Sequence, residues 1–179
     1  MLLPILLAVG ILAILFIVII AGRPDEFTVL RSVKISAPPE KVFPHVNELR
    51  KWDAWSPWAK LDPDCKIDFA GPVAGIGAGY AWSGNNKVGE GRMTITESRP
   101  NELIGLKLEF LRPFKATNAA VFTFKSAGNQ TEVVWNMNGK NNFFFKVFGL
   151  FMDCDSMAGK DFEKGLASLK TLAEAAEKN

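Results

Sequence analysis

The chain has 179 residues, 48% of them hydrophobic, and its 21 Lys+Arg against 19 Asp+Glu leave a formal net charge of +2. This near balance, with no block of lysine or arginine, argues against a nucleic-acid partner. One histidine and two cysteines cannot supply the usual ligands of a zinc site, so we expect neither a metal nor a cofactor.

Residues 1–22 contain no charged side chain. A helix of about 20 apolar residues crosses the hydrocarbon core of a bilayer. A cleaved secretory signal is the alternative, but it calls for a basic leader, a shorter apolar core and a small-residue cleavage site. We therefore expect a retained single-pass anchor at 1–22. Because Arg23, Arg31 and Lys34 follow it, we expect the rest of the chain to face the cytoplasm.

The remaining residues, 23–179, have the length of one domain with a sizeable core. Cys65 and Cys154 lie far apart and belong to no metal-binding or redox spacing. We expect two idle or buried thiols, with a disulfide as the alternative if the domain is extracytoplasmic.

The first elements of this domain are a strand and a helix. Residues 27–36 alternate in polarity with a period of two, which predicts a half-buried strand. Residues 38–47 begin with prolines and an acid, which fit a first helical turn, while Pro44 is expected to kink or shorten the helix. Three tryptophans follow within residues 52–58 and must pack against another part of the domain.

Further strands are predicted from the same alternation and from the turns between them. They are expected at residues 65–69, around Tyr80 and Trp82, and at 88–98, 102–111, 116–126 and 131–138. One face of these strands is apolar and the other polar, which is typical of an antiparallel sheet with one wet side. The glycines at 75, 77 and 79 precede a strand rather than a helix, so they do not form a phosphate-binding loop.

The pattern changes its period near the end of the chain. Residues 143–151 are aromatic nearly all round, and residues 161–177 form an amphipathic stripe that predicts a long terminal helix. The expected fold class is α+β, with a curved antiparallel sheet of about six to seven strands wrapped on the C-terminal helix, plus the N-terminal transmembrane helix.

Bulky apolar side chains on the inward faces are the candidate ligand-pocket residues. They are Trp55, Trp58, Tyr80, Trp82, Met93, Phe110, Phe122, Phe124, Trp135 and Met137. Such residues either fill a core or line an apolar cavity for a lipid-like or polycyclic ligand. For an enzyme, Tyr80 and the single histidine, His45, are the candidate proton donors or acceptors.

Four stretches resemble the bacterial polyketide cyclase-like branch of the SRPBCC superfamily, which includes START domains and the birch pollen allergen family. They are residues 35–43 (ISAPPEKVF), 52–58 (WDAWSPW), 91–97 (GRMTITE) and 160–166 (KDFEKGL). The resemblance implies a helix-grip fold that binds hydrophobic small molecules between sheet and terminal helix. Arg92 alternates outward, which argues against an arginine-based cyclase mechanism.

We therefore expect a membrane-anchored protein that binds a hydrophobic small molecule or lipid. An enzyme of the cyclase or dehydratase kind, acting on a hydrophobic cyclic or polyketide substrate, is the alternative. A tethered interaction module with a filled core is the third possibility.

Overall fold

The computed structural model describes residues 2–141, 146–147, 149–150 and 154–176. Its helical elements are α1 (Leu2–Ala21), α2 (Pro39–Asn47), the 3-10 helix η1 (Leu49–Ala54) and α4 (Cys154–Ala176). Its strands are β1 (Glu26–Ile35), β2 (Lys66–Ala70), β3 (Gly79–Ser83), β4 (Glu90–Arg99), β5 (Leu103–Arg112), β6 (Ala116–Ala127) and β7 (Gln130–Lys140).

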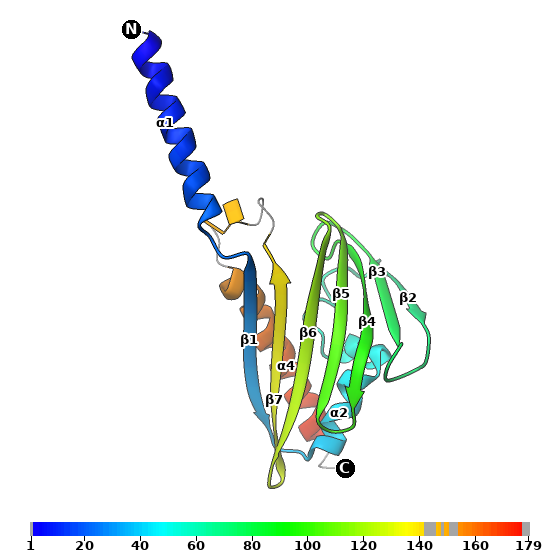
Figure 1. Ribbon diagram of the computed structural model, residues 1–179. Helices are drawn as coiled ribbons and strands as arrows, with labels where there is room; N and C mark the ends of the chain where they lie inside the picture. The colour runs from blue at the N-terminus through cyan, green and yellow to red at the C-terminus, as the bar shows by residue number, and fades with distance from the viewer. Residues whose placement is uncertain (1, 142–145, 148, 151–153, 177–179) are drawn as a thin grey trace.

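The strands form one antiparallel sheet in the order β1-β7-β6-β5-β4-β3-β2. Only β1 leaves the sequential order, because it pairs with β7 at the far edge, with Val33 opposite Val133. A register shift between Ile95 and Glu97 interrupts the β4–β5 pairing, and such bulges increase the twist of a sheet. The sheet is strongly curved (Figure 1).

The terminal helix α4 lies against the β1 side of the sheet, whereas α2 lies toward the end of the sheet opposite α1 (Figure 1). The 3-10 helix η1 packs Trp52 against Phe122 and Trp135. Arg31 projects from β1 toward α4 and makes ion pairs of 2.9 Å with Asp155 and 2.8 Å with Glu163. The guanidinium also occupies the space that a β-carbon at Gly159 would need. The missing side chain at Gly159 therefore lets β1 approach the helix closely.

The N-terminal helix α1 projects away from the sheet (Figure 1). Residues Leu3–Ala21 have a mean hydropathy of 3.3, and a helix of 20 residues is about 30 Å long, the thickness of a hydrocarbon core. Most of its large side chains are exposed, but Ile20, near its end, is fully buried. By length and composition α1 is able to span a bilayer.

The structure confirms the α+β helix-grip architecture and every strand expected from alternation. Pro44 lies inside α2, which ends three residues later. The predicted terminal helix is confirmed and is longer than its amphipathic stripe, because α4 begins at Cys154 and its first turns carry no apolar stripe. Ion pairing to Arg31, a contact across the fold, supports those turns instead. Most of the aromatic segment 143–151 lies outside the described residues.

Candidate functional site

The concave face of the sheet is built from rows of side chains on registered strand partners. One row runs across all seven strands through Phe69, Tyr80, Met93, Leu108, Asn118, Gly139 and Phe27. The next row toward α1 runs through Ile67, Trp82, Gly91, Phe110 and Ala116. These two upper rows differ from the rows below them in how far other elements cover them.

The lower half of the concave face is a filled aromatic core. Trp135 is stacked on Phe162 of α4, with ring centroids 3.8 Å apart and planes 4° from parallel. Phe122 also stacks on Trp135, with ring centroids 4.8 Å apart. Trp55 contacts both Phe122 and Trp135 edge-on. The indole of Trp55 donates a 3.0 Å hydrogen bond to the carbonyl of His45. The tryptophan-rich segment therefore seals this half of the sheet.

The ten predicted pocket residues differ in how deeply they are buried. Five are core residues with 5% exposure or less: Trp55, Met93, Phe122, Phe124 and Trp135. Five are half-buried: Trp58, Tyr80, Trp82, Phe110 and Met137. Trp58 contacts Trp135 and Phe162 edge-on. Met137 is paired with Ala120, one row below the two upper rows. The half-buried candidates of the upper rows are therefore Tyr80, Trp82 and Phe110.

Four aromatic rings taken from both upper rows form a line from β2 to β5, which we call the aromatic row. The ring centroids lie 5.5 Å apart for Phe69 and Tyr80, 6.0 Å for Tyr80 and Trp82, and 5.9 Å for Trp82 and Phe110. Phe69 is 38% exposed. These rings present a continuous apolar surface that is incompletely covered, which is the kind of surface a hydrophobic ligand covers.

Trp82 is held flat over its neighbouring strand. A β-carbon at Gly91 would lie 2.5 Å from Cζ2 of Trp82, so the absence of a side chain at Gly91 creates the space for the indole. The indole nitrogen donates a 3.1 Å hydrogen bond to the carbonyl of Val88. The orientation of the Trp82 ring is thus fixed before any ligand arrives.

Asn118 is the one amide among the residues of these two rows. It is 9% exposed, and its side-chain nitrogen lies 3.9 Å from the sulfur of Met137. A thioether is a weak acceptor, so this amide retains hydrogen-bonding capacity beside the apolar side chain of Leu108. A few polar groups in an apolar lining are what orients a ligand.

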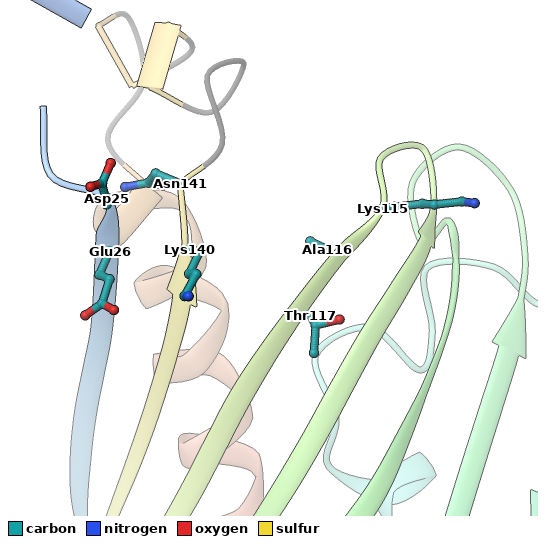
Figure 2. A pocket seen from close by; sticks show the side chains of 7 residues that line it. All are labelled: Asp25, Glu26, Lys115, Ala116, Thr117, Lys140 and Asn141. Carbon is teal, nitrogen blue, oxygen red and sulfur yellow. The ribbon is translucent and has the colours of Figure 1, made fainter. Parts of the chain in front are cut away.

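Beyond the Asn118–Gly139 pair, β6 and β7 separate at the end of the sheet nearest α1 (Figure 1). A hollow of about 720 Å³ lies there, lined by Asp25, Glu26, Lys115, Ala116, Thr117, Lys140 and Asn141. Figure 2 shows Ala116 and Thr117 on one side of the gap and Lys140 and Asn141 on the other, while the ammonium of Lys115 points away from it. The hollow therefore opens at the edge of the two upper rows.

A second hollow joins this edge to the apolar helix. It measures about 330 Å³ and is lined by Ile17, Ile20 and Ala21 of α1 together with Asp25, Asn141 and Lys146. Asp25 and Asn141 line both hollows. None of the ten predicted pocket residues lines either hollow, so the predicted pocket stays a prediction.

The candidate acid and base residues do not form one constellation. Burial raises the pKa of Tyr80 to about 12, so its phenol stays protonated and can donate a hydrogen bond. Burial lowers the pKa of His45, whose Nδ1 is buried without a hydrogen-bond partner. No hydrogen bond joins the two in the part of the chain that the structure describes. Among those residues, no group of three or more His, Cys, Asp or Glu is placed to hold a metal.

A family described as polyketide cyclase / dehydrase and lipid transport matches residues 26–174 of the sequence. The chain belongs to this family. No curated protein matches the chain.

Solved structures agree with this assignment at the level of the fold. A protein from Nitrosospira multiformis superposes with a TM-score of 0.62 at 17% identity, covering 86% of this chain and 100% of that chain. The Aha1 dimer from Colwellia psychrerythraea gives 0.59 at 18% identity, covering 83% and 96%. Ara h 8.0201 gives 0.58 at 12% identity, covering 84% and 99%. The chain is a polyketide cyclase/lipid transport family member of the SRPBCC superfamily.

The candidate pocket set left out three residues of the upper face in this family member: Phe69, Leu108 and Asn118. Leu108 alternates with the same period as Phe110, so the sequence already indicated its inward position. The alternation that placed Ala120 and Phe122 inward also places Asn118 inward, so the period of two contained that signal. Phe69 was hidden by the shortness of β2, because five residues give too few alternations to assign a face.

Proposed function

We propose that this protein is a membrane-anchored binder of a hydrophobic small molecule, lipid-like or polycyclic, held on the upper concave face. The family description names polyketides and lipids, both largely apolar. The observation that carries the proposal is the incompletely covered aromatic row Phe69, Tyr80, Trp82 and Phe110, in which Gly91 makes room for Trp82. The amide of Asn118 supplies the polar contact that orients the ligand.

The placement of α1 supports exchange of this ligand with a bilayer. We assign residues 1–22 as a transmembrane anchor and 23–179 as the binding domain. The end of α1 lines one hollow, which shares Asp25 and Asn141 with the hollow between β6 and β7. A molecule leaving the bilayer beside α1 passes along these two hollows to Ala116, in the same row as Trp82 and Phe110.

The alternative is an enzyme of the cyclase or dehydratase kind that acts on a hydrophobic cyclic or polyketide substrate. One observation favours it: the protonated phenol of Tyr80 lies in the aromatic row and can serve as a proton donor. The other predicted acid–base residue, His45, belongs to α2 and is joined to Tyr80 by no hydrogen bond among the described residues. The third possibility is an interaction module with a filled core. The lower half of the concave face fits that description, and the incompletely covered upper half does not.

For the topology, we propose that the binding domain faces the cytoplasm, since Arg23, Arg31 and Lys34 follow the span. A membrane-impermeant thiol reagent should then leave Cys65 unmodified in intact cells and modify it after permeabilisation. Burial raises the pKa of the Cys65 thiol, which slows its modification. The rate measured after permeabilisation is therefore the reference for intact cells. Equal modification in intact cells would reverse the assigned orientation.

The experiment that tests ligand binding is native mass spectrometry of the purified full chain released from detergent, with identification of the bound mass. We expect an apolar molecule at about one per chain, and its loss in Trp82→Ala. Leu30→Ala is the control, because Leu30 is 50% exposed and projects from the opposite face of β1. A wild-type chain without any bound molecule, after purification from its native membrane, contradicts the proposal.

A further inference from the structure

The β5–β6 turn carries exposed apolar side chains at the end of the sheet where α1 joins it. Leu111, in the last residues of β5, is 45% exposed, and Phe114, in the turn itself, is 52% exposed. Isolated apolar residues on a surface need no explanation, but two of them beside basic residues on one loop are typical of a membrane contact.

Basic side chains surround these two. Arg112 and Lys115 belong to the same turn, and Lys87 belongs to the neighbouring β3–β4 connection, which contacts the turn. Lys115 points away from the hollow (Figure 2), and within the described part of the chain no carboxylate pairs with it. Its charge is therefore available to an anionic surface.

The turn is held rigidly by the β3–β4 connection. Arg112 donates a 2.5 Å hydrogen bond to the carbonyl of Gly84 and pairs with Glu90 at 3.7 Å. A β-carbon at Gly89, where φ is +67°, would overlap the carbonyl of Arg112. The exposed side chains are thus presented by a braced loop.

Contacts at the base of α1 set the direction in which this end of the sheet faces. Arg23 donates a 2.5 Å hydrogen bond to the carbonyl of Gly149, Asp25 pairs with Lys146, and Ile20 is fully buried. Figure 1 shows the end of α1 and the β5–β6 turn at the same end of the sheet. A bilayer crossed by α1 therefore has its surface next to this turn.

We propose that the β5–β6 turn, Leu111 to Lys115, docks on the anionic surface of the same bilayer that α1 spans. Leu111 and Phe114 enter the interfacial layer, and Lys87 and Lys115 contact lipid phosphates, while Arg112 keeps its contacts with Gly84 and Glu90. With α1 this makes two attachments, and the hollow between β6 and β7 is held against the membrane. The inference rests on the membrane anchoring proposed above, but it does not require that a ligand is bound.

The test is lysine modification of the full chain in nanodiscs of phosphatidylcholine with anionic phosphatidylglycerol, read by mass spectrometry. Lys125 is the internal reference, because it is exposed and lies near the β6–β7 turn at the opposite end of the sheet (Figure 1). We expect Lys115 to react about fivefold more slowly than Lys125, the factor expected for one lysine at an anionic surface. The variant Leu111→Ser/Phe114→Ser should restore the rate of Lys115.

Equal rates for Lys115 and Lys125 in wild type, or slow modification of Lys115 that the double variant does not change, would overturn the docking proposal. A full chain that does not enter nanodiscs would overturn it as well. The bound apolar molecule is measured on the same samples by native mass spectrometry. A bound molecule without protection of Lys115 would contradict docking alone. Protection of Lys115 without a bound molecule would contradict ligand binding alone.

Discussion

The indole of Trp82 lies over Gly91, its registered partner on β4, so closely that a β-carbon there would approach the ring to 2.5 Å and the carbonyl of Glu109 to 2.7 Å. The ring continues toward Phe110, whose centroid is 5.9 Å away. A missing side chain on one strand therefore determines the position of an aromatic ring on the next.

Gly91→Ala should displace this indole and weaken ligand retention. The added methyl group meets both a ring and a backbone carbonyl, so we expect a stability loss of about 1–3 kcal/mol. We expect the affinity for the bound apolar molecule to fall about tenfold. Gly10→Ala is the control, because a β-carbon at Gly10 meets nothing within 4 Å. Unchanged retention in Gly91→Ala would remove Trp82 from the ligand site.

Phe162→Ala should damage the fold rather than the ligand site. The ring is 1% exposed and stacked on Trp135 at 3.8 Å, so its removal leaves a cavity that costs about 3–5 kcal/mol. A thermal melt of the full chain in detergent, followed by tryptophan fluorescence, measures the loss. Met157→Ala, on the same helix but 55% exposed, should change little. A small effect of Phe162→Ala would mean that the lower core is loosely packed.

Tyr80 is the single tyrosine of the chain, so its ionisation can be followed by ultraviolet absorbance without interference from another phenol. Burial raises its pKa from 10.0 to about 12. The folded chain should titrate near pH 12 and the denatured chain near pH 10. Because the folded state holds the proton more tightly, stability should fall as the pH rises from about 10 to about 12. A folded-state midpoint near 10 would show that Tyr80 is solvated.

Glu109 should contribute to loss of stability in acid. Arg92 donates a 2.8 Å hydrogen bond to its carboxylate, and hydrogen bonds from Arg92 and then from Lys107 lower the pKa of Glu109 from 4.5 to about 2. The unfolded chain takes up this proton at higher pH than the folded chain, so stability falls as the pH drops from about 4.5 to about 2. Glu109→Gln should make the fall in melting temperature over this range shallower. An identical slope in wild type and variant would contradict the assignment.

The sheet was predictable because its signal is local. In β4 to β7, polarity alternates along ten or more residues, and a period of two is read directly from neighbouring residues. The outward position of Arg92 followed from that alternation, and the structure pairs Arg92 with Glu109. The ion pair that supports the first turns of α4 was not predictable from periodicity, because Asp155 and Arg31 are distant in sequence.

The sequence predicted which bulky side chains point inward, but not which of them line a site and which fill the core. Inward bulk identified both Trp135 and Trp82, but one is stacked on Phe162 of α4 and the other lies half-buried over Gly91. That difference depends on where α4 and η1 cover the sheet, which is a property of packing between distant segments. The gap between β6 and β7 likewise depends on where pairing stops after Asn118 and Gly139.

The most direct test of the binding site is photo-crosslinking in nanodiscs that contain a lipid with a diazirine on its acyl chain. Crosslinked residues are mapped by peptide sequencing. Within α1, Leu3–Ala21 should be labelled in every sample, which verifies that the probe and the span are in contact. The account predicts additional crosslinks at Tyr80, Trp82, Phe110 and Met137, and their reduction in Gly91→Ala. Crosslinks confined to α1 in wild type would contradict it.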